Sequence, residues 1–164
     1  MYYSYIEVHP DELGEIQQDL ELLPVFIDPD RPKSLANRID LGKASEVIYF
    51  LVTGKSVRDG SKISMALLGQ DVLKDDYESE PYLGYTYYLK PDQVQEVLAV
   101  LGNLSVKIVE SRVESTNMVA EVFPGIWKKG IDIAIKYLVG EYNKLLEFYY
   151  IVASNRNAVI ITIE

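Results

Sequence analysis

The sequence predicts one α+β domain over residues 1–164, in which a small sheet that includes both terminal strands is packed with about five to six helices. Three observations support this class. Residues Tyr2–Val8 are aromatic and β-branched, as in a strand. Residues Ala158–Ile163 form a near-continuous apolar run, which is typical of a central strand covered on both faces. Between these segments, apolar residues recur mainly at helical spacing.

The first helix is expected directly after the opening strand. Pro10 suits a first helical turn, and Asp11 and Glu12 suit the positive end of the helix dipole. The stripe that continues this helix consists of Leu13, Ile16, Leu20 and Leu23. The prolines between residues 24 and 32 then predict an irregular loop.

Two further helices and an acidic loop are predicted in the middle of the chain. Asp40 is expected to cap a helix that extends from Leu41 to Val52 and stops at Gly54. A short helix over Ile63–Leu68 is expected to end at Gly69. Residues 71–81 carry five carboxylates and one lysine, and they predict an exposed loop.

The C-terminal half alternates strand and helix again. A strand is predicted over Tyr82–Leu89 and a helix over Pro91–Gly102. Ser105 is expected to cap a shorter helix. The longest helix is expected to begin near Ile131 and to end at a turn formed by residues 155–157, ahead of the final strand.

The chain contains one histidine, His9, and no cysteine. This composition excludes a thiolate nucleophile, a disulfide framework and the usual structural zinc sites. His9 directly precedes Pro10 and is interpreted as a residue of a helix terminus. We therefore expect no catalytic residue, no metal site and no cofactor.

The net charge of -9 indicates the kind of partner. An acidic chain repels the phosphate backbone, so general nucleic-acid binding is disfavoured and a basic protein is the expected partner. The predicted contact lies in the acidic loop, at Asp75, Asp76, Glu78 and Glu80. Carboxylates could also hold a hard cation, but the loop lacks the EF-hand spacing.

Trp127 and Tyr49 are the candidate residues for a ligand pocket. The alternative interpretation of Trp127, shared by Phe123 and Phe50, is that these aromatic side chains belong to the core.

The sequence also predicts where the protein resides. No apolar run approaches the roughly 20 residues that span a bilayer, so no membrane association is expected. The first residues lack the basic region and apolar core of a signal peptide. A cytoplasmic location is therefore expected.

Several segments together resemble a known family. They are His9-Pro10-Asp11-Glu12-Leu13, Asp40-Leu41-Gly42-Lys43, Phe50-Leu51-Val52-Thr53-Gly54, Leu67-Leu68-Gly69, Tyr88-Leu89-Lys90-Pro91 and Val122-Phe123-Pro124-Gly125-Ile126-Trp127. The chain is similar in these places to the YfbM-like family of bacterial proteins, a domain of unknown function. The resemblance implies an α+β fold and no established activity, cofactor or catalytic residue.

The chain departs from the pattern of that family in two places. Tryptophan and histidine, frequent in the family's helix before Thr53-Gly54, are replaced by residues such as Ser45, Glu46 and Tyr49. His9 and Lys90 stand where the family often has serine or threonine, and both are expected to be poorer helix caps.

Three functions from different classes remain open. The first is a non-enzymatic protein-binding module, in its most specific form an immunity-type protein that neutralises a basic toxin. The second is a small-ligand binding protein with a pocket near Trp127. The third is an enzyme that uses paired carboxylates for acid–base chemistry. The sequence does not indicate an oligomeric state.

Overall fold

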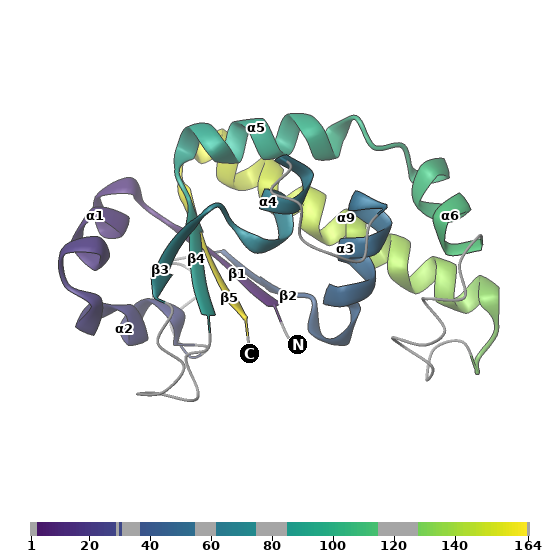
Figure 1. Cartoon of the computed structure of the whole chain (residues 1–164), viewed down its shortest axis with the longest axis horizontal. Coiled ribbons are helices and arrows are strands. Elements are labelled where there is room, and N and C mark those ends of the chain that lie inside the picture. The colour runs from purple at the N-terminus through teal and green to yellow at the C-terminus, as the bar shows by residue number, and fades with distance from the viewer. Residues whose placement is uncertain are drawn as a thin grey trace.

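The computed structural model describes residues 3–28, 30, 37–54, 62–74, 85–114 and 128–163. Within them, five strands form one antiparallel sheet in the order β2-β1-β5-β4-β3 (Figure 1). The strands are β1 (Tyr3–Val8), β2 (Arg38–Asp40), β3 (Asp71–Lys74), β4 (Tyr85–Leu89) and β5 (Ala158–Ile163). Because β1 and β5 pair along their whole length, the prediction that both terminal strands share a sheet is confirmed.

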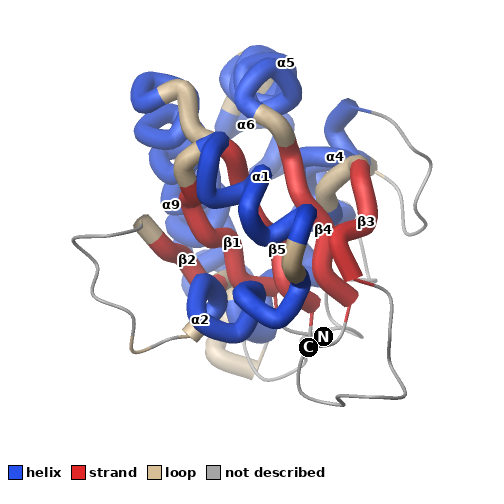
Figure 2. The backbone as a smooth tube through the Cα atoms, turned by 90° about the vertical axis from the view of Figure 1, so that its left-hand side faces the viewer, coloured by secondary structure: helices blue, strands red, loops and turns tan. Residues whose placement is uncertain are grey.

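Helices cover both faces of this sheet, which confirms the α+β class (Figure 2). They are α1 (Pro10–Gln18), η1 (Leu20–Leu22), α2 (Leu23–Ile27), η2 (Gly42–Ala44), α3 (Ser45–Thr53), α4 (Lys62–Leu68), α5 (Pro91–Gly102), α6 (Val106–Glu114) and α9 (Ile131–Asn155). The layer formed by α1 and α2 packs on one face, and the larger layer that contains α5 and α9 packs on the other.

The final strand, β5, lies in the centre of the sheet and is buried throughout. Val159 and Ile161 contribute to the core on the α9 side, whereas Ala158 and Ile160 contribute to the core under α1 and α2. This alternation explains the continuous apolar run, because every side chain of the strand faces a covering layer.

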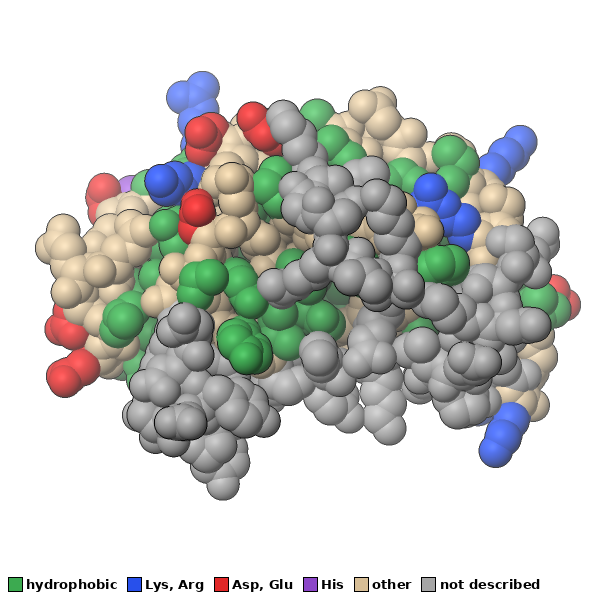
Figure 3. Space-filling view, viewed as in Figure 1, with side chains coloured by type: hydrophobic (Ala, Val, Ile, Leu, Met, Phe, Trp, Pro, Cys, Tyr) green, Lys and Arg blue, Asp and Glu red, His purple; other side chains and the backbone are tan. Residues whose placement is uncertain are grey.

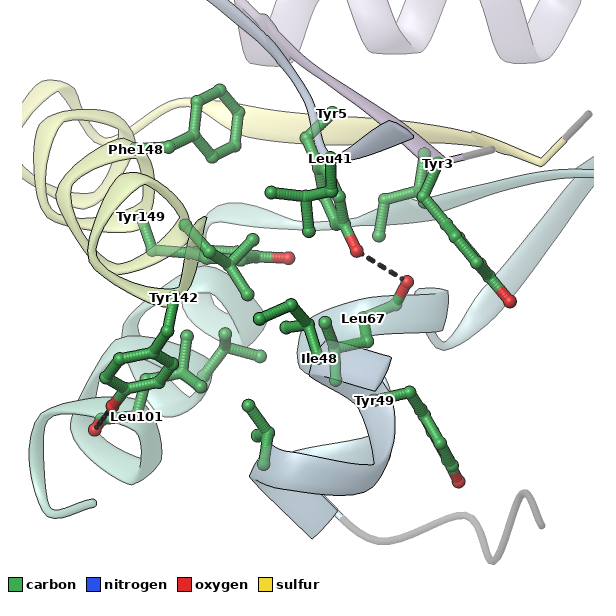
Figure 4. Close-up of a cluster of buried hydrophobic side chains, with 14 of the residues drawn as sticks. Tyr3, Tyr5, Leu41, Ile48, Tyr49, Leu67, Leu101, Tyr142, Phe148 and Tyr149 are labelled. Atoms are coloured by element: carbon green, nitrogen blue, oxygen red, sulfur yellow. Dashed lines mark hydrogen bonds between the residues drawn. The ribbon is translucent and has the colours of Figure 1, made fainter. Parts of the chain in front are cut away.

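Tyrosines are an important part of the larger core (Figure 4). The Tyr5 hydroxyl donates to the Leu67 carbonyl at 3.0 Å, and the Tyr142 hydroxyl donates to the Leu101 carbonyl at 2.8 Å. Each of these carbonyls lies in the last turn of a helix, where it lacks a partner within the helix. The core tyrosines therefore provide both apolar area and helix termination.

The predicted helix ends are largely observed. Gly54 and Gly69 adopt the left-handed conformation with φ of 72° and 73° after α3 and α4, as expected for helix stops. His9 caps α1 better than its residue type suggests. Its Nδ1 accepts from the backbone N–H of Asp11 at 3.2 Å, and its own N–H donates to Glu12 Oε2 at 2.9 Å.

Three short elements differ from the predictions. The loop predicted from the prolines contains α2, because Pro24 occupies the first turn of a helix, where its missing N–H is not needed. Asp40 ends the strand β2 instead of capping a helix, and its Oδ1 accepts from the Gly42 N–H at 2.6 Å. Residues Asp71–Lys74 of the predicted acidic loop pair with β4 as a strand.

Candidate functional site

Tyr49 is a core residue in the structure. Its side chain is 8% exposed, and its hydroxyl lies 3.2 Å from the Ser64 hydroxyl, which is also buried. Trp127 and Phe123 lie outside the described residues, whereas Phe50 is half-buried and packs against the larger core. The pocket predicted from Trp127 and Tyr49 therefore stays a prediction.

The four predicted contact residues Asp75, Asp76, Glu78 and Glu80 also lie outside the described residues. They follow directly after Lys74, the last residue of β3. Their proposed role stays a prediction as well.

A second acidic segment, which sequence reasoning did not single out, covers one face of the sheet. We call residues 9–30 the acidic lobe; they comprise α1, η1 and α2 and contain no lysine or arginine. The exposed carboxylates of the lobe are Asp11, Glu15, Asp19, Glu21, Asp28 and Asp30. Carboxylates are visible along the left-hand end of the molecule in Figure 3, where Figure 1 places α1 and α2.

The acidic lobe has a rigid base and an apolar component at its surface. Leu13, Ile16 and Leu23 anchor it in the smaller core against the sheet. Leu20 and Val25 are 42% and 62% exposed. Exposed apolar side chains among like charges combine area for contact with a field that attracts a cationic partner.

Two carboxylates of the lobe also hold its backbone in place. Asp19 Oδ1 accepts from the Glu21 N–H at 3.0 Å, and Asp28 Oδ1 accepts from the Asp30 N–H at 2.8 Å. The first bond stabilises the turn before η1, and the second stabilises the turn after α2. Within the described residues, the side chains of Glu15, Glu21 and Asp30 have no such role, and all three are exposed.

A groove of about 280 Å³ lies between β2 and α9. Its apolar wall consists of Ile39, Phe148 and Ile151. Its polar lining consists of Asn37, Arg38, Lys144 and Glu147. This volume is at the lower limit for a small-molecule site, and its lining carries both charge signs.

An ion pair on α9 determines the electrostatics beside this groove. Lys144 Nζ lies 2.6 Å from Glu141 Oε1, and the Glu141 side chain is nearly buried. The hydrogen bond to Glu141 raises the pKa of Lys144. Partial burial, and next the Glu141 carboxylate, raise the pKa of Tyr137 above its ordinary value. Lys144 is thus paired within its own helix, while its side chain stays more than half exposed.

The buried carboxylate of Glu7 joins three segments that are far apart in the sequence. Its Oε1 accepts from Asn155 Nδ2 at 2.8 Å and from Asn157 Nδ2 at 2.7 Å, and its Oε2 accepts from Asn37 Nδ2. The residue is 4% exposed. Three amide donors satisfy a carboxylate without a counter-ion, so we assign Glu7 to the framework that holds β1, β2 and the end of α9 together.

No other chemistry stands out in the part of the chain that the structure describes. There, no three histidine or carboxylate side chains come together in a way that could hold a metal ion. None of the helices described there is both long and apolar enough to cross a bilayer.

The fold and these surfaces define an α+β protein built on one antiparallel sheet, with an acidic lobe on one face and a small groove at one edge. The chain belongs to the family described as "Domain of unknown function (DUF1877)", whose sequence model matches residues 1–162. No curated protein matches it.

A solved structure supports the same conclusion about the fold. The chain is similar to the crystal structure of a protein of unknown function, YfbM from Escherichia coli, with a TM-score of 0.73 and 15% sequence identity. The similarity covers 100% of both chains. The predicted resemblance to the YfbM-like family is therefore confirmed.

Proposed function

We propose that the protein is a non-enzymatic binding module that recognises a basic protein partner through the acidic lobe. The observation that carries this proposal is the exposed set of six carboxylates over residues 9–30, in a stretch without a single lysine or arginine. A local field of one sign steers an oppositely charged partner and speeds its association. In the cytoplasm, the most specific form of this role is an immunity-type protein that neutralises a basic toxin.

Two features support a protein partner over a small ligand. Buried leucines and isoleucines anchor the lobe on the sheet, so its exposed carboxylates lie on a packed surface. Leu20 and Val25 supply exposed apolar area within it. Protein interfaces combine such apolar contacts with a charged rim. The acidic residues Asp75, Asp76, Glu78 and Glu80 remain part of the proposed contact.

The experiment compares two variants that lose the same number of negative charges. The lobe variant carries Glu15→Gln, Glu21→Gln and Asp30→Asn. The control variant carries Asp92→Asn, Glu110→Gln and Asp132→Asn, which lie on α5, α6 and α9. All six positions can be neutralised with little change in side-chain volume, so both variants should retain the melting temperature of the native protein to within a few degrees.

Binding is measured with poly-L-lysine as a probe of defined charge, at several salt concentrations. We expect the lobe variant to bind the probe more weakly than the control variant and with a flatter salt dependence, because fewer counter-charges are engaged. Equal weakening of both variants would mean that only the net charge matters. In that case, the lobe is not a recognition surface and the proposal fails.

A further inference from the structure

Among the described residues, β2 is the outermost strand at one edge of the sheet. In the described residues it pairs with β1 alone, with Ile39 opposite Tyr5. On either side of this pair, the Glu7 N–H donates to the Asn37 carbonyl at 2.9 Å and the Leu41 N–H donates to the Tyr3 carbonyl at 3.1 Å. Positions 37, 39 and 41 therefore direct their backbone groups toward β1.

The residues between these positions direct their backbone groups outward. In an antiparallel ladder, successive residues alternate between hydrogen bonds to one neighbour and to the other. The N–H and C=O groups of Arg38 and Asp40 therefore point away from β1, toward the position of a sixth strand. An edge of this kind is a template for pairing with another chain.

The charges on this edge are self-complementary, and each also has a partner within its own chain: Arg38 Nη1 donates to the Ile27 carbonyl, and Asp40 Oδ1 accepts from the Gly42 N–H. In an antiparallel pair of two β2 strands centred on Ile39, Arg38 of each copy is opposite Asp40 of the other copy. Directly opposite residues share a face of the sheet, and opposite charges in such positions attract each other. In the same arrangement, the outward N–H and C=O groups of Arg38 in one copy form hydrogen bonds with those of Asp40 in the other copy. One two-fold axis thus pairs the outward backbone groups and places opposite charges beside one another.

The surroundings of the strand fit a second copy as well. Ile39 lies on the α9 side of the sheet, where it forms the apolar wall of the groove together with Phe148 and Ile151. Ile151 is 36% exposed. Figure 2 shows β2 at the border of the sheet beside α9. Pairing of the two strands would place Ile39 against Ile39 of the second copy and would cover the rim of both grooves.

We propose that the protein forms a two-fold symmetric homodimer through antiparallel pairing of β2 with β2 of a second copy. The two five-stranded sheets then continue into one another across the dimer axis. This inference does not depend on the proposed function, because it is argued from the backbone and charges of β2 and not from the exposed carboxylates of the acidic lobe.

The first test uses the absence of cysteine from the native chain. Ile39→Cys places one thiol per chain at the proposed axis. Opposite residues at a non-hydrogen-bonded position have Cα atoms about 4.5 Å apart, which is within the range that a disulfide bridges. Val72→Cys is the matched control, because Val72 lies on β3 at the other edge of the sheet and is 52% exposed.

Under mild oxidation, we expect Ile39→Cys to form a covalent dimer much faster than Val72→Cys, although the control thiol is well exposed. Sedimentation of the native protein should show a monomer–dimer equilibrium as its concentration is raised. A native chain that remains monomeric throughout would overturn the proposal. So would an Ile39→Cys chain that cross-links no faster than the control.

The second test exchanges the charges. Arg38→Asp alone places carboxylates opposite one another, and Asp40→Arg alone places guanidinium groups opposite one another. Each variant should self-associate more weakly by about an order of magnitude or more, whereas their equimolar mixture should recover dimers. A mixture of two folded variants that stays monomeric would contradict the proposed register. If either variant fails to fold by circular dichroism, the cysteine experiment decides alone.

Discussion

Gly140 occupies the middle of α9, where glycine is costly. Among the described residues, a Cβ atom built at this position meets no atom within 4 Å, so there is space for a methyl group. Gly140→Ala should therefore stabilise the protein by about 1 kcal/mol, the difference in helix propensity between the two residues. For a domain of this size, the melting temperature should rise by about 2–4 °C.

Gly69→Ala is the control with the opposite expectation. Gly69 has a φ of 73°, and a Cβ built there would lie 2.5 Å from the Cβ of Tyr87. Backbone strain and overlap together should cost about 2 kcal/mol or more. Thermal and urea unfolding of both variants gives the two free energies. A Gly140→Ala variant that is less stable than the native protein would refute the reasoning, because it would mean that the middle of α9 is packed against something.

Two further predictions concern buried polar groups. Glu7→Gln replaces one acceptor oxygen by a donor that faces the amides of Asn37, Asn155 and Asn157, so urea unfolding should show a loss of about 1.5–3 kcal/mol. A loss near zero would show that the carboxylate is not required. Alkaline unfolding is the second prediction: burial raises the pKa of Tyr5 and of Tyr149. Because the folded pKa exceeds the unfolded value of about 10, this contribution is fully present below pH 10 and is lost as the pH rises further. Exposed tyrosines such as Tyr150 ionise first, and the last part of the tyrosinate absorbance should increase together with the loss of circular dichroism. Full ionisation of a still-folded chain would contradict the burial.

The parts of the fold that depend on long patterns could be predicted from the sequence. The run Ala158–Ile163 could be assigned to a central strand because burial on both faces favours apolar residues at successive positions, and Thr162 is its one polar residue. The stripe from Ile131 onward has enough turns to define a helix on its own. The short elements could not be predicted, because Arg38–Asp40 is a three-residue edge strand with two charged residues and so lacks an apolar signal.

The site was harder to predict than the fold, because charge patterns do not reveal which segments share a surface. The acidic loop was selected for its density of carboxylates. The residues of the acidic lobe read as helix and loop, although seven carboxylates without a lysine or arginine over residues 9–30 are visible in the sequence. The groove depends on β2, α9 and the order of strands, which only the tertiary structure brings together. The spacing of residues along a single helix therefore could not indicate the groove.

The central position of β5 has a consequence for how the chain is made. Synthesis proceeds from the N-terminus, so β1 is complete about 150 residues before its inner neighbour exists. The strand order allows β2 to pair with β1 early, but β4 can reach β1 only through β5. Until residue 163 has been added, the sheet consists of two separate hairpin-like pairs, each with an open edge. Contacts over such long sequence separations slow folding, and the nascent chain exposes Tyr3, Tyr5 and Ile6 on an unpaired strand edge during this interval. Because of this topology, the addition of β5 is the step that joins the two strand pairs into one sheet.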